Sequence, residues 1–221
     1  MTEKELRQAI IDTCLEMNAL GINQGTSGNV SARFKKGMLI TPSGIPYGDL
    51  TPEDIAYMPF SKKYGDWRGP HRPSSEWRFH YDIMASRADV DAIVHTHALY
   101  ATVLSIARLE IPACHYMIAA MGGAPIRCAG YATFGTKELS DEAITALEGR
   151  KACLLANHGM IAVGPNLAKA LWMAVELETL AKQYYLSRAI AGGPVILDDE
   201  ELSRVAEKMS SYGLKTKVES A

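Results

Sequence analysis

Residues 92–100 read AIVHTHALY, an apolar run that contains two histidines two positions apart. The apolar residues are typical of a buried strand. Because residues i and i+2 of a strand point to the same face, His95 and His97 are expected to project together. Two imidazoles on one face can bind one metal ion, or they can be ordinary histidines satisfied by hydrogen bonds. A third ligand would decide between these interpretations.

Two residues elsewhere in the chain are candidates for further metal ligands. His158 follows the apolar run ACLLAN, where a strand is expected to end in a turn. Three neutral imidazoles suit zinc, and a catalytic zinc keeps its fourth position for water, substrate or a displaceable carboxylate. Glu76, in PSSEWRFH, is the candidate for that carboxylate, although a helix start also explains it as a charge that complements the helix dipole. His80, four residues later, is interpreted as a packing histidine or one that supports the ligands.

Small and hydroxyl residues form three candidate anion-binding segments. Ser74 and Ser75 are expected at a helix start, where free N–H groups and hydroxyls favour phosphate. In NQGTSGNVS the glycines permit turns that aim N–H groups inward, and neighbouring side chains add donors. TPSGIPY is the third segment. Each is also explained as an ordinary turn, and none has the lysine and spacing of a nucleotide-binding P-loop.

The composition is that of a folded globular protein, with 221 residues, 48% of them hydrophobic and 22% charged. This length favours a single domain over residues 1–221. The net charge is −2, with basic and acidic residues interspersed, so neither nucleic acid nor a membrane surface is an expected partner. The charged N-terminal segment and the absence of a long apolar run favour a cytoplasmic location. No CxxC pair occurs, and the cysteines are expected to be reduced and mostly buried: Cys14, Cys114, Cys128 and Cys153.

Hydrophobic periodicity predicts helices mixed with strands, some of which are linked as hairpins. Helices are expected over 2–20, 74–87, 98–108, 136–149, 166–190 and 198–212, and strands over 28–34, 37–42, 91–97, 152–159 and 160–164. The segment 59–73 is expected to be a loop or a short hairpin. In the helix over 98–108, Leu99, Val103 and Ile106 share one stripe. This pattern favours a sheet flanked by helices over a pure βαβ array.

Seven motifs, in this order, resemble the class II aldolases of the L-fuculose-1-phosphate aldolase and L-ribulose-5-phosphate 4-epimerase family. They are GTSGNVS, LITPSGIPY, PSSEWRFH, HTHA, IPACHYMIAAMGG, YATFGTKEL and NHG. The resemblance runs from about residue 7 to 190 and is particularly close to the fuculose-phosphate aldolase branch. It implies an α/β fold, a three-layer α/β/α sandwich around a mostly antiparallel central sheet. It also implies a homotetramer with active sites at the subunit interfaces.

The resemblance also implies roles for individual residues. One zinc ion per subunit, or another divalent metal such as Mn²⁺ or Co²⁺, would be bound by Glu76, His95, His97 and His158. Glu76 would also be the acid/base in turnover, and Tyr116 would reach the aldehyde end of the substrate from a neighbouring subunit. Phe134 and Tyr212 would lie on that aldehyde side. Phosphate would be bound by Thr26, Ser27, Gly28, Asn29, Ser43, Gly44, Ser74 and Ser75.

The reaction that this resemblance implies is reversible cleavage of a ketose 1-phosphate to dihydroxyacetone phosphate and a small aldehyde. The substrate would be L-fuculose 1-phosphate or a 5-deoxypentulose 1-phosphate such as 5-deoxyribulose or 5-methylthioribulose 1-phosphate. A pentulose 5-phosphate 4-epimerase and a methylthioribulose-1-phosphate dehydratase are alternatives within the superfamily. A non-catalytic module similar to the adducin head is an alternative of another class, and the presence of all four candidate ligands argues against it.

Overall fold

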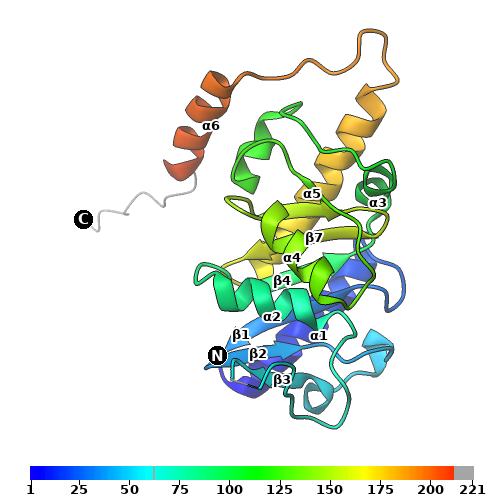
Figure 1. Cartoon of the computed structure of the whole chain (residues 1–221), viewed down its shortest axis with the longest axis vertical. Helices are drawn as coiled ribbons and strands as arrows, with labels where there is room; N and C mark the ends of the chain where they lie inside the picture. The colour runs from blue at the N-terminus through cyan, green and yellow to red at the C-terminus, as the bar shows by residue number, and fades with distance from the viewer. Residues whose placement is uncertain (62, 212–221) are drawn as a thin grey trace, which may run out of the picture.

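A computed structural model describes residues 1–61 and 63–211 of the chain, and Tyr212 lies outside the described residues (Figure 1). Its seven strands form one sheet in the order β3-β2-β1-β4-β7-β6-β5. Neighbouring strands are antiparallel, except that β5 runs parallel to β6. The mostly antiparallel sheet that the family resemblance implies is therefore confirmed. The strands are β1 (Asn29–Phe34), β2 (Gly37–Ile40), β3 (Ala56–Pro59), β4 (Ala92–Thr96), β5 (Cys128–Ala129), β6 (Ala152–Leu155) and β7 (Gly159–Gly164).

Helices cover both faces of this sheet and make the predicted three layers (Figure 1). One face packs against α1 (Glu3–Ala19), α3 (Leu99–Ile106) and α5 (Leu167–Ser187). The other face packs against α2 (Trp77–Ser86) and α4 (Lys137–Ala146), which also contact each other. The last helix, α6 (Asp199–Ser211), packs against the 3-10 helix η3 (Tyr116–Met121). Two shorter 3-10 helices are η1 (Tyr47–Asp49) and η2 (Pro52–Asp54).

The central strand β4 serves two hydrophobic cores at once. Ile93 belongs to the cluster beneath α2 and α4, whereas Val94 belongs to the cluster beneath α1, α3 and α5. Both residues are wholly buried, and burial of such a side chain stabilises the fold by about 1.5–3 kcal/mol. This two-sided burial explains why the strand reads as a nearly continuous apolar run. His95, at its far end, is paired with Asn29 of β1 and Ile161 of β7.

Local signals place most element ends within a few residues of the predicted positions. The Thr2 hydroxyl accepts a hydrogen bond from the Glu5 backbone N–H, and the Glu5 carboxylate accepts one from the Thr2 N–H, which is the capping box expected for α1. Helix α2 begins at Trp77 and not at Ser74 as predicted. The reason is a turn, in which the Ser74 carbonyl and hydroxyl accept hydrogen bonds from the N–H groups of Trp77 and Glu76, respectively.

Two strands and one exposed stripe differ from expectation. The strands β3 and β5 were not predicted, and the segment after β3 returns so that Tyr57 and Arg68 exchange two backbone hydrogen bonds. Leu99 and Ile106 of α3 are 65% and 58% exposed, so the predicted stripe faces outward while Leu104 is buried. The four cysteines are free, as expected. None of the helices within the described residues is both long enough and apolar enough to cross a membrane.

Candidate metal centre

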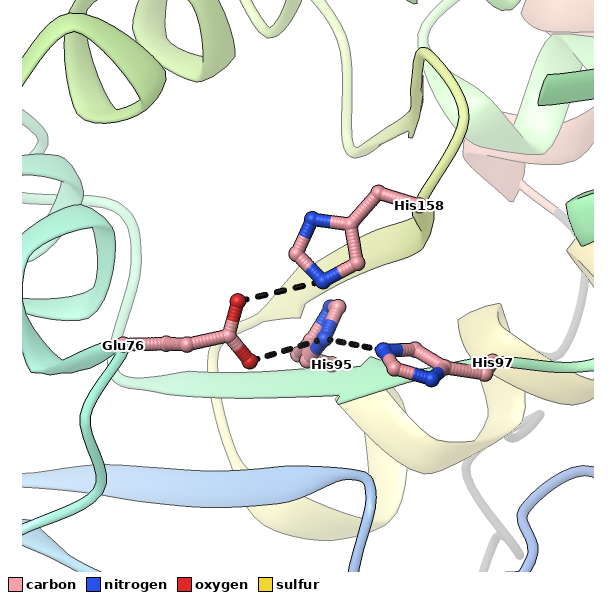
Figure 2. A group of neighbouring side chains, drawn as sticks. All are labelled: Glu76, His95, His97 and His158. Atoms are coloured by element: carbon pink, nitrogen blue, oxygen red, sulfur yellow. Dashed lines mark hydrogen bonds and ion pairs between the residues drawn. The ribbon is translucent and has the colours of Figure 1, made fainter. Parts of the chain in front are cut away.

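Four side chains from distant parts of the chain converge at the end of β4 (Figure 2). His95 lies at the end of the strand, and His97 lies just beyond it. His158 comes from the turn between β6 and β7, and Glu76 from the residue before α2. One ligand atom from each residue lies within 4.8 Å of all the others. The structure therefore brings together the four predicted metal ligands.

The sheet and its turns hold these side chains in place. His158 follows Asn157, whose positive φ of 55° turns the chain between β6 and β7. A Cβ atom on Gly159 would lie 2.7 Å from the Thr96 carbonyl oxygen and 2.8 Å from His97 Cδ2. Only glycine therefore permits this close approach of the turn to the histidine strand. A Cβ on Gly28 would likewise lie 2.6 Å from the His95 carbonyl oxygen, on the other side of β4.

The hydrogen bonds of the cluster leave lone pairs that face one another. His95 Nδ1 lies 2.9 Å from the Met160 carbonyl oxygen and must donate to it, so the neutral ring presents a lone pair at Nε2. That Nε2 lies 3.2 Å from Glu76 Oε2 and 3.2 Å from His97 Nε2. Glu76 Oε1 lies 3.1 Å from His158 Nε2, is buried, and receives no hydrogen bond from any described residue.

This donor set fits a divalent metal ion. Lone pairs of nitrogen and carboxylate oxygen repel one another at these distances unless a cation or a proton lies between them. His95 donates a hydrogen bond from Nδ1 to a backbone carbonyl, which leaves Nε2 for a metal ion. This arrangement is typical of metal-binding histidines. The residues present are therefore suited to bind a metal through His95, His97, His158 and Glu76.

The electrostatics of the cluster favour an ionised carboxylate at Glu76 and a neutral imidazole at His97. Burial raises the pKa of Glu76, but neighbouring His95 and His158 outweigh burial and hold this pKa below its ordinary value. Burial and the neighbouring histidines lower the pKa of His97 to about 4. Interactions with His95 and His158 therefore favour the ionised form of Glu76, and a bound metal ion would act in the same direction.

A cavity of about 270 Å³ opens on the metal cluster. Tyr131 and Phe134, which are 58% and 64% exposed, form part of its wall in the loop before α4. Phe134, which was predicted for the aldehyde side, therefore lines the cavity beside the candidate metal ligands. The complete lining is Ser75, Glu76, His97, Tyr131, Ala132, Phe134, Asn157 and His158.

A second cavity, of about 420 Å³, shares Ser75 with the first. Ser43 and Arg72 also line it, together with two tryptophans. The Ser43 N–H donates a hydrogen bond to the Arg72 carbonyl, so these two segments run together. Arg72 is exposed, and its guanidinium has no hydrogen bond or ion pair with the rest of the described chain. A hydroxyl-lined cavity with an unpaired guanidinium is suited to an anion.

The remaining predicted residues have other surroundings. Asn29 donates its side-chain amide to Glu76, and the Ser27 hydroxyl bonds to Asn23 and Gln24. The other predicted phosphate ligands, Thr26, Gly28, Gly44 and Ser74, lie in the predicted segments but outside the lining of both cavities. Tyr116, on η3, is 51% exposed and also lies outside both linings.

Sequence reasoning missed Tyr131, Asn157 and Arg72 as lining residues. Tyr131 opens the YATFG motif, and Asn157 precedes His158, so both stand beside residues that were singled out. Arg72 directly precedes the PSS motif within a segment of charged residues that has no hydrophobic period. Nothing in that local pattern distinguishes it from the other arginines nearby.

Comparisons with known proteins agree over nearly the whole chain. The family described as Class II Aldolase and Adducin N-terminal domain matches residues 8–185. A 5-methylthioribulose-1-phosphate/5-deoxyribulose-1-phosphate aldolase of Rhodospirillum rubrum is 54% identical, over 94% of this chain and 92% of its own. An L-fuculose phosphate aldolase of Escherichia coli K12 is 52% identical, over 97% of this chain and 99% of its own. A solved structure of an L-fuculose 1-phosphate aldolase has a TM-score of 0.90 at 42% identity, over 95% of this chain and 98% of that one.

Proposed function

This chain belongs to the family of class II aldolases and adducin N-terminal domains and is a class II aldolase, a lyase. We propose that it uses zinc to cleave a ketose 1-phosphate into dihydroxyacetone phosphate and a small aldehyde. One observation carries this proposal, which is the convergence of three histidines and one buried glutamate within 4.8 Å. A non-catalytic module would have no use for such a cluster, because burying three imidazoles and a carboxylate together costs stability that a bound cation would offset.

Zinc is the metal that this donor set favours. Three imidazoles and one carboxylate make a four-coordinate set of nitrogen and oxygen ligands, which zinc prefers and which Mn²⁺ or Co²⁺ also accept. When bound, the metal supplies a Lewis acid that stabilises negative charge on the substrate oxygens as the carbon–carbon bond breaks. Within the described residues, no lysine lines the metal cavity, so the residues there favour this chemistry over a Schiff base.

Glu76 and Tyr116 are proposed to move the two protons of the reaction. As the C3–C4 bond breaks, its electrons pass toward the C2 carbonyl, the C4 hydroxyl loses its proton, and C3 must gain one. The buried carboxyl group of Glu76 is suited to deliver a proton to C3 and to take it back in the reverse direction. The Tyr116 phenol is proposed to exchange a proton with the C4 oxygen from a neighbouring subunit.

The cavity that contains Ser43, Arg72 and Ser75 is proposed to hold the phosphate group. Ser75 lines both this cavity and the metal cavity, so a substrate that bridges the two would place its phosphate away from the metal and its carbonyl near it. The hydroxyls supply donors, and Arg72 supplies charge. The segments 26–29 and 44, with Ser74, are proposed to complete the phosphate site as expected from the resemblance.

The aldehyde side is proposed to accept a small apolar end, either a methyl group or a thioether. Tyr131 and Phe134 offer apolar surface beside the metal ligands. The two relatives act, by their names, on substrates that differ in this part, since one is named for 5-methylthioribulose and 5-deoxyribulose 1-phosphate and the other for L-fuculose phosphate. Both kinds of substrate therefore belong in a test.

The enzyme is proposed to be a homotetramer in which Tyr116 serves a neighbour's active site. Tyr116 is 51% exposed and lies outside the lining of both cavities of its own chain. Leu99 and Ile106 are also exposed, and large apolar side chains on the surface often mark an interface. An assembly would cover these residues and bring the phenol to a second chain.

The proposal is tested by offering the purified enzyme a panel of ketose 1-phosphates and measuring dihydroxyacetone phosphate, with and without a chelator. Release of triose phosphate that stops on chelation and returns with zinc is the expected result. An epimerised pentulose 5-phosphate without triose release would instead indicate the epimerase, and loss of water from methylthioribulose 1-phosphate would indicate the dehydratase. Absence of bound metal after careful purification would contradict the metal centre.

A further inference from the structure

A buried chain of hydrogen bonds runs from the metal cluster to the middle of the sheet. Asn29 Nδ2 lies 3.0 Å from Glu76 Oε2, and Asn29 Oδ1 lies 2.5 Å from His80 Nε2. The other ring nitrogen, His80 Nδ1, lies 2.7 Å from the Ser31 hydroxyl. All four residues are at most 6% exposed. His80 and Glu76 are only four residues apart in the sequence, near the start of α2. Even so, their connection by hydrogen bonds passes through Asn29 of β1.

In this series of hydrogen bonds, each group can act only as a donor or only as an acceptor toward its neighbour. The ionised carboxylate of Glu76 accepts hydrogen bonds only, so the Asn29 amide nitrogen must be the group that faces it. The Asn29 carbonyl oxygen is then left to accept from His80, which must carry its proton on Nε2. A neutral ring leaves Nδ1 as an acceptor, and the Ser31 hydroxyl donates to it. Burial lowers the pKa of His80 to about 3, which agrees with a neutral ring.

His80 therefore decides which way the Asn29 amide points. Without a donor at the position of His80 Nε2, the Asn29 carbonyl oxygen would lack a partner inside the protein, and the amide could rotate to present that oxygen to Glu76. Two acceptors would then face each other, and the carboxylate would move. Both nitrogens of this wholly buried ring are hydrogen-bonded, so the tautomer of His80 is fixed, and with it the donor that holds the Asn29 carbonyl oxygen.

We propose that His80 is a positioning residue that fixes the Glu76 carboxylate for proton transfer, acting through the Asn29 amide. This inference rests on the proposed function, in which Glu76 moves the proton at C3. It also gives the Asn29 side-chain amide a role at Glu76. His80 itself touches neither the metal ligands' donor atoms nor the cavity that would hold the substrate.

The test compares His80→Leu with His80→Gln, because glutamine keeps an N–H donor where leucine has none. We expect His80→Leu to lower kcat about 10- to 100-fold, a part of the usual contribution of acid–base catalysis, with KM changed less than about twofold. His80→Gln should retain kcat within about threefold of the original enzyme, since the Asn29 amide stays fixed. The exposed His71 provides a matched control, and His71→Leu should leave both constants unchanged.

A spectroscopic measurement separates this inference from the proposed activity. In the cobalt-substituted protein the visible absorption bands report the position of the Glu76 carboxylate, so His80→Leu should shift them and His80→Gln should not. His80→Met, which likewise lacks an N–H donor, should shift them in the same direction and serves if the leucine variant does not fold. If the original enzyme cleaves no ketose 1-phosphate, the proposed function fails, while the cobalt bands still test the position of Glu76.

Either of two results would overturn the role of His80. In the first, His80→Leu retains the original kcat and cobalt spectrum. In the second, the leucine and glutamine variants lose activity equally and in step with their melting temperature and metal content, which indicates a structural role alone.

Discussion

Replacing Glu76 with glutamine tests the assignment on which the mechanism depends. Glutamine has nearly the same shape, so it leaves no cavity, and its side-chain oxygen can still accept the hydrogen bond that Asn29 donates over 3.0 Å. The three histidines remain as ligands, so zinc is retained. The amide cannot release or accept a proton at neutral pH, however, and the Glu76 acid/base is lost.

The expected loss follows from what acid–base catalysis contributes. A positioned acid/base contributes about 10²- to 10⁴-fold, so kcat of Glu76→Gln should fall by that factor. At about 1.4 kcal/mol for each tenfold, this equals about 3–5 kcal/mol of lost transition-state stabilisation. The amide N–H also lies where it can donate to His158 Nε2, which is 3.1 Å from the present carboxylate oxygen, so kcat must be measured at saturating zinc.

The assay is steady-state release of dihydroxyacetone phosphate, with zinc measured by elemental analysis of the same sample. Glu16→Gln, an exposed position on α1, is the matched control and should behave as the original enzyme. A Glu76→Gln enzyme that keeps one zinc per chain and turns over within about threefold of normal would refute the acid/base role. Glu76 is the one carboxylate among the described residues that line the metal cavity.

Three further predictions test the assembly, the turn and the phosphate site. If Tyr116 serves a neighbouring chain, then mixing and refolding inactive Tyr116→Phe and Glu76→Gln enzymes should restore about a quarter of the original activity, because random assembly gives about that share of sites an intact Glu76 and an intact Tyr116. No recovery after verified subunit exchange would place Tyr116 in the active site of its own chain. Gly159→Ala should weaken zinc binding about tenfold, measured by competition with a chromogenic chelator, because the added methyl group displaces His97; unchanged affinity would mean that the turn yields freely. Arg72→Leu should raise KM about 10-fold or more with little change in kcat, since one charge-assisted hydrogen bond to phosphate is lost; an unchanged KM would place the phosphate elsewhere.

The candidate metal centre was predictable because three of the side chains that form it follow strong local patterns. The period of two along β4 correctly places His95 and His97 on one side, and the apolar run before His158 correctly predicts a strand that ends in a turn. The position of Glu76 follows from the turn that Ser74 begins, which delays the helix and leaves the carboxylate free to face the histidines. Predicting that Glu76 meets the histidines required the family resemblance, since no local pattern links residue 76 to residue 158.

Other parts of the structure depend on contacts that local patterns do not encode. The strand β5 has only two residues, and its parallel pairing with β6 requires no alternation of its own. The outward stripe of Leu99 and Ile106 reads as a core face because periodicity identifies an apolar side of a helix without naming its partner. The hydrogen bond between His80 and Asn29 joins residues 51 positions apart, so only the folded sheet reveals it.

The buried histidine of the metal cluster and the exposed wall of the cavity beside it have different evolutionary freedom. His95 is wholly buried at the end of a central strand, so a change there disturbs the core as well as the ligand set. Tyr131 and Phe134 stand mostly in solvent on a loop, where substitutions usually alter stability by less than about 0.5 kcal/mol. New aldehyde preferences can therefore arise by mutation in this loop without destabilising the fold. Two relatives are almost equally identical to this chain but are named for different sugar phosphates. A conserved metal cluster beside a variable loop would produce such a pair.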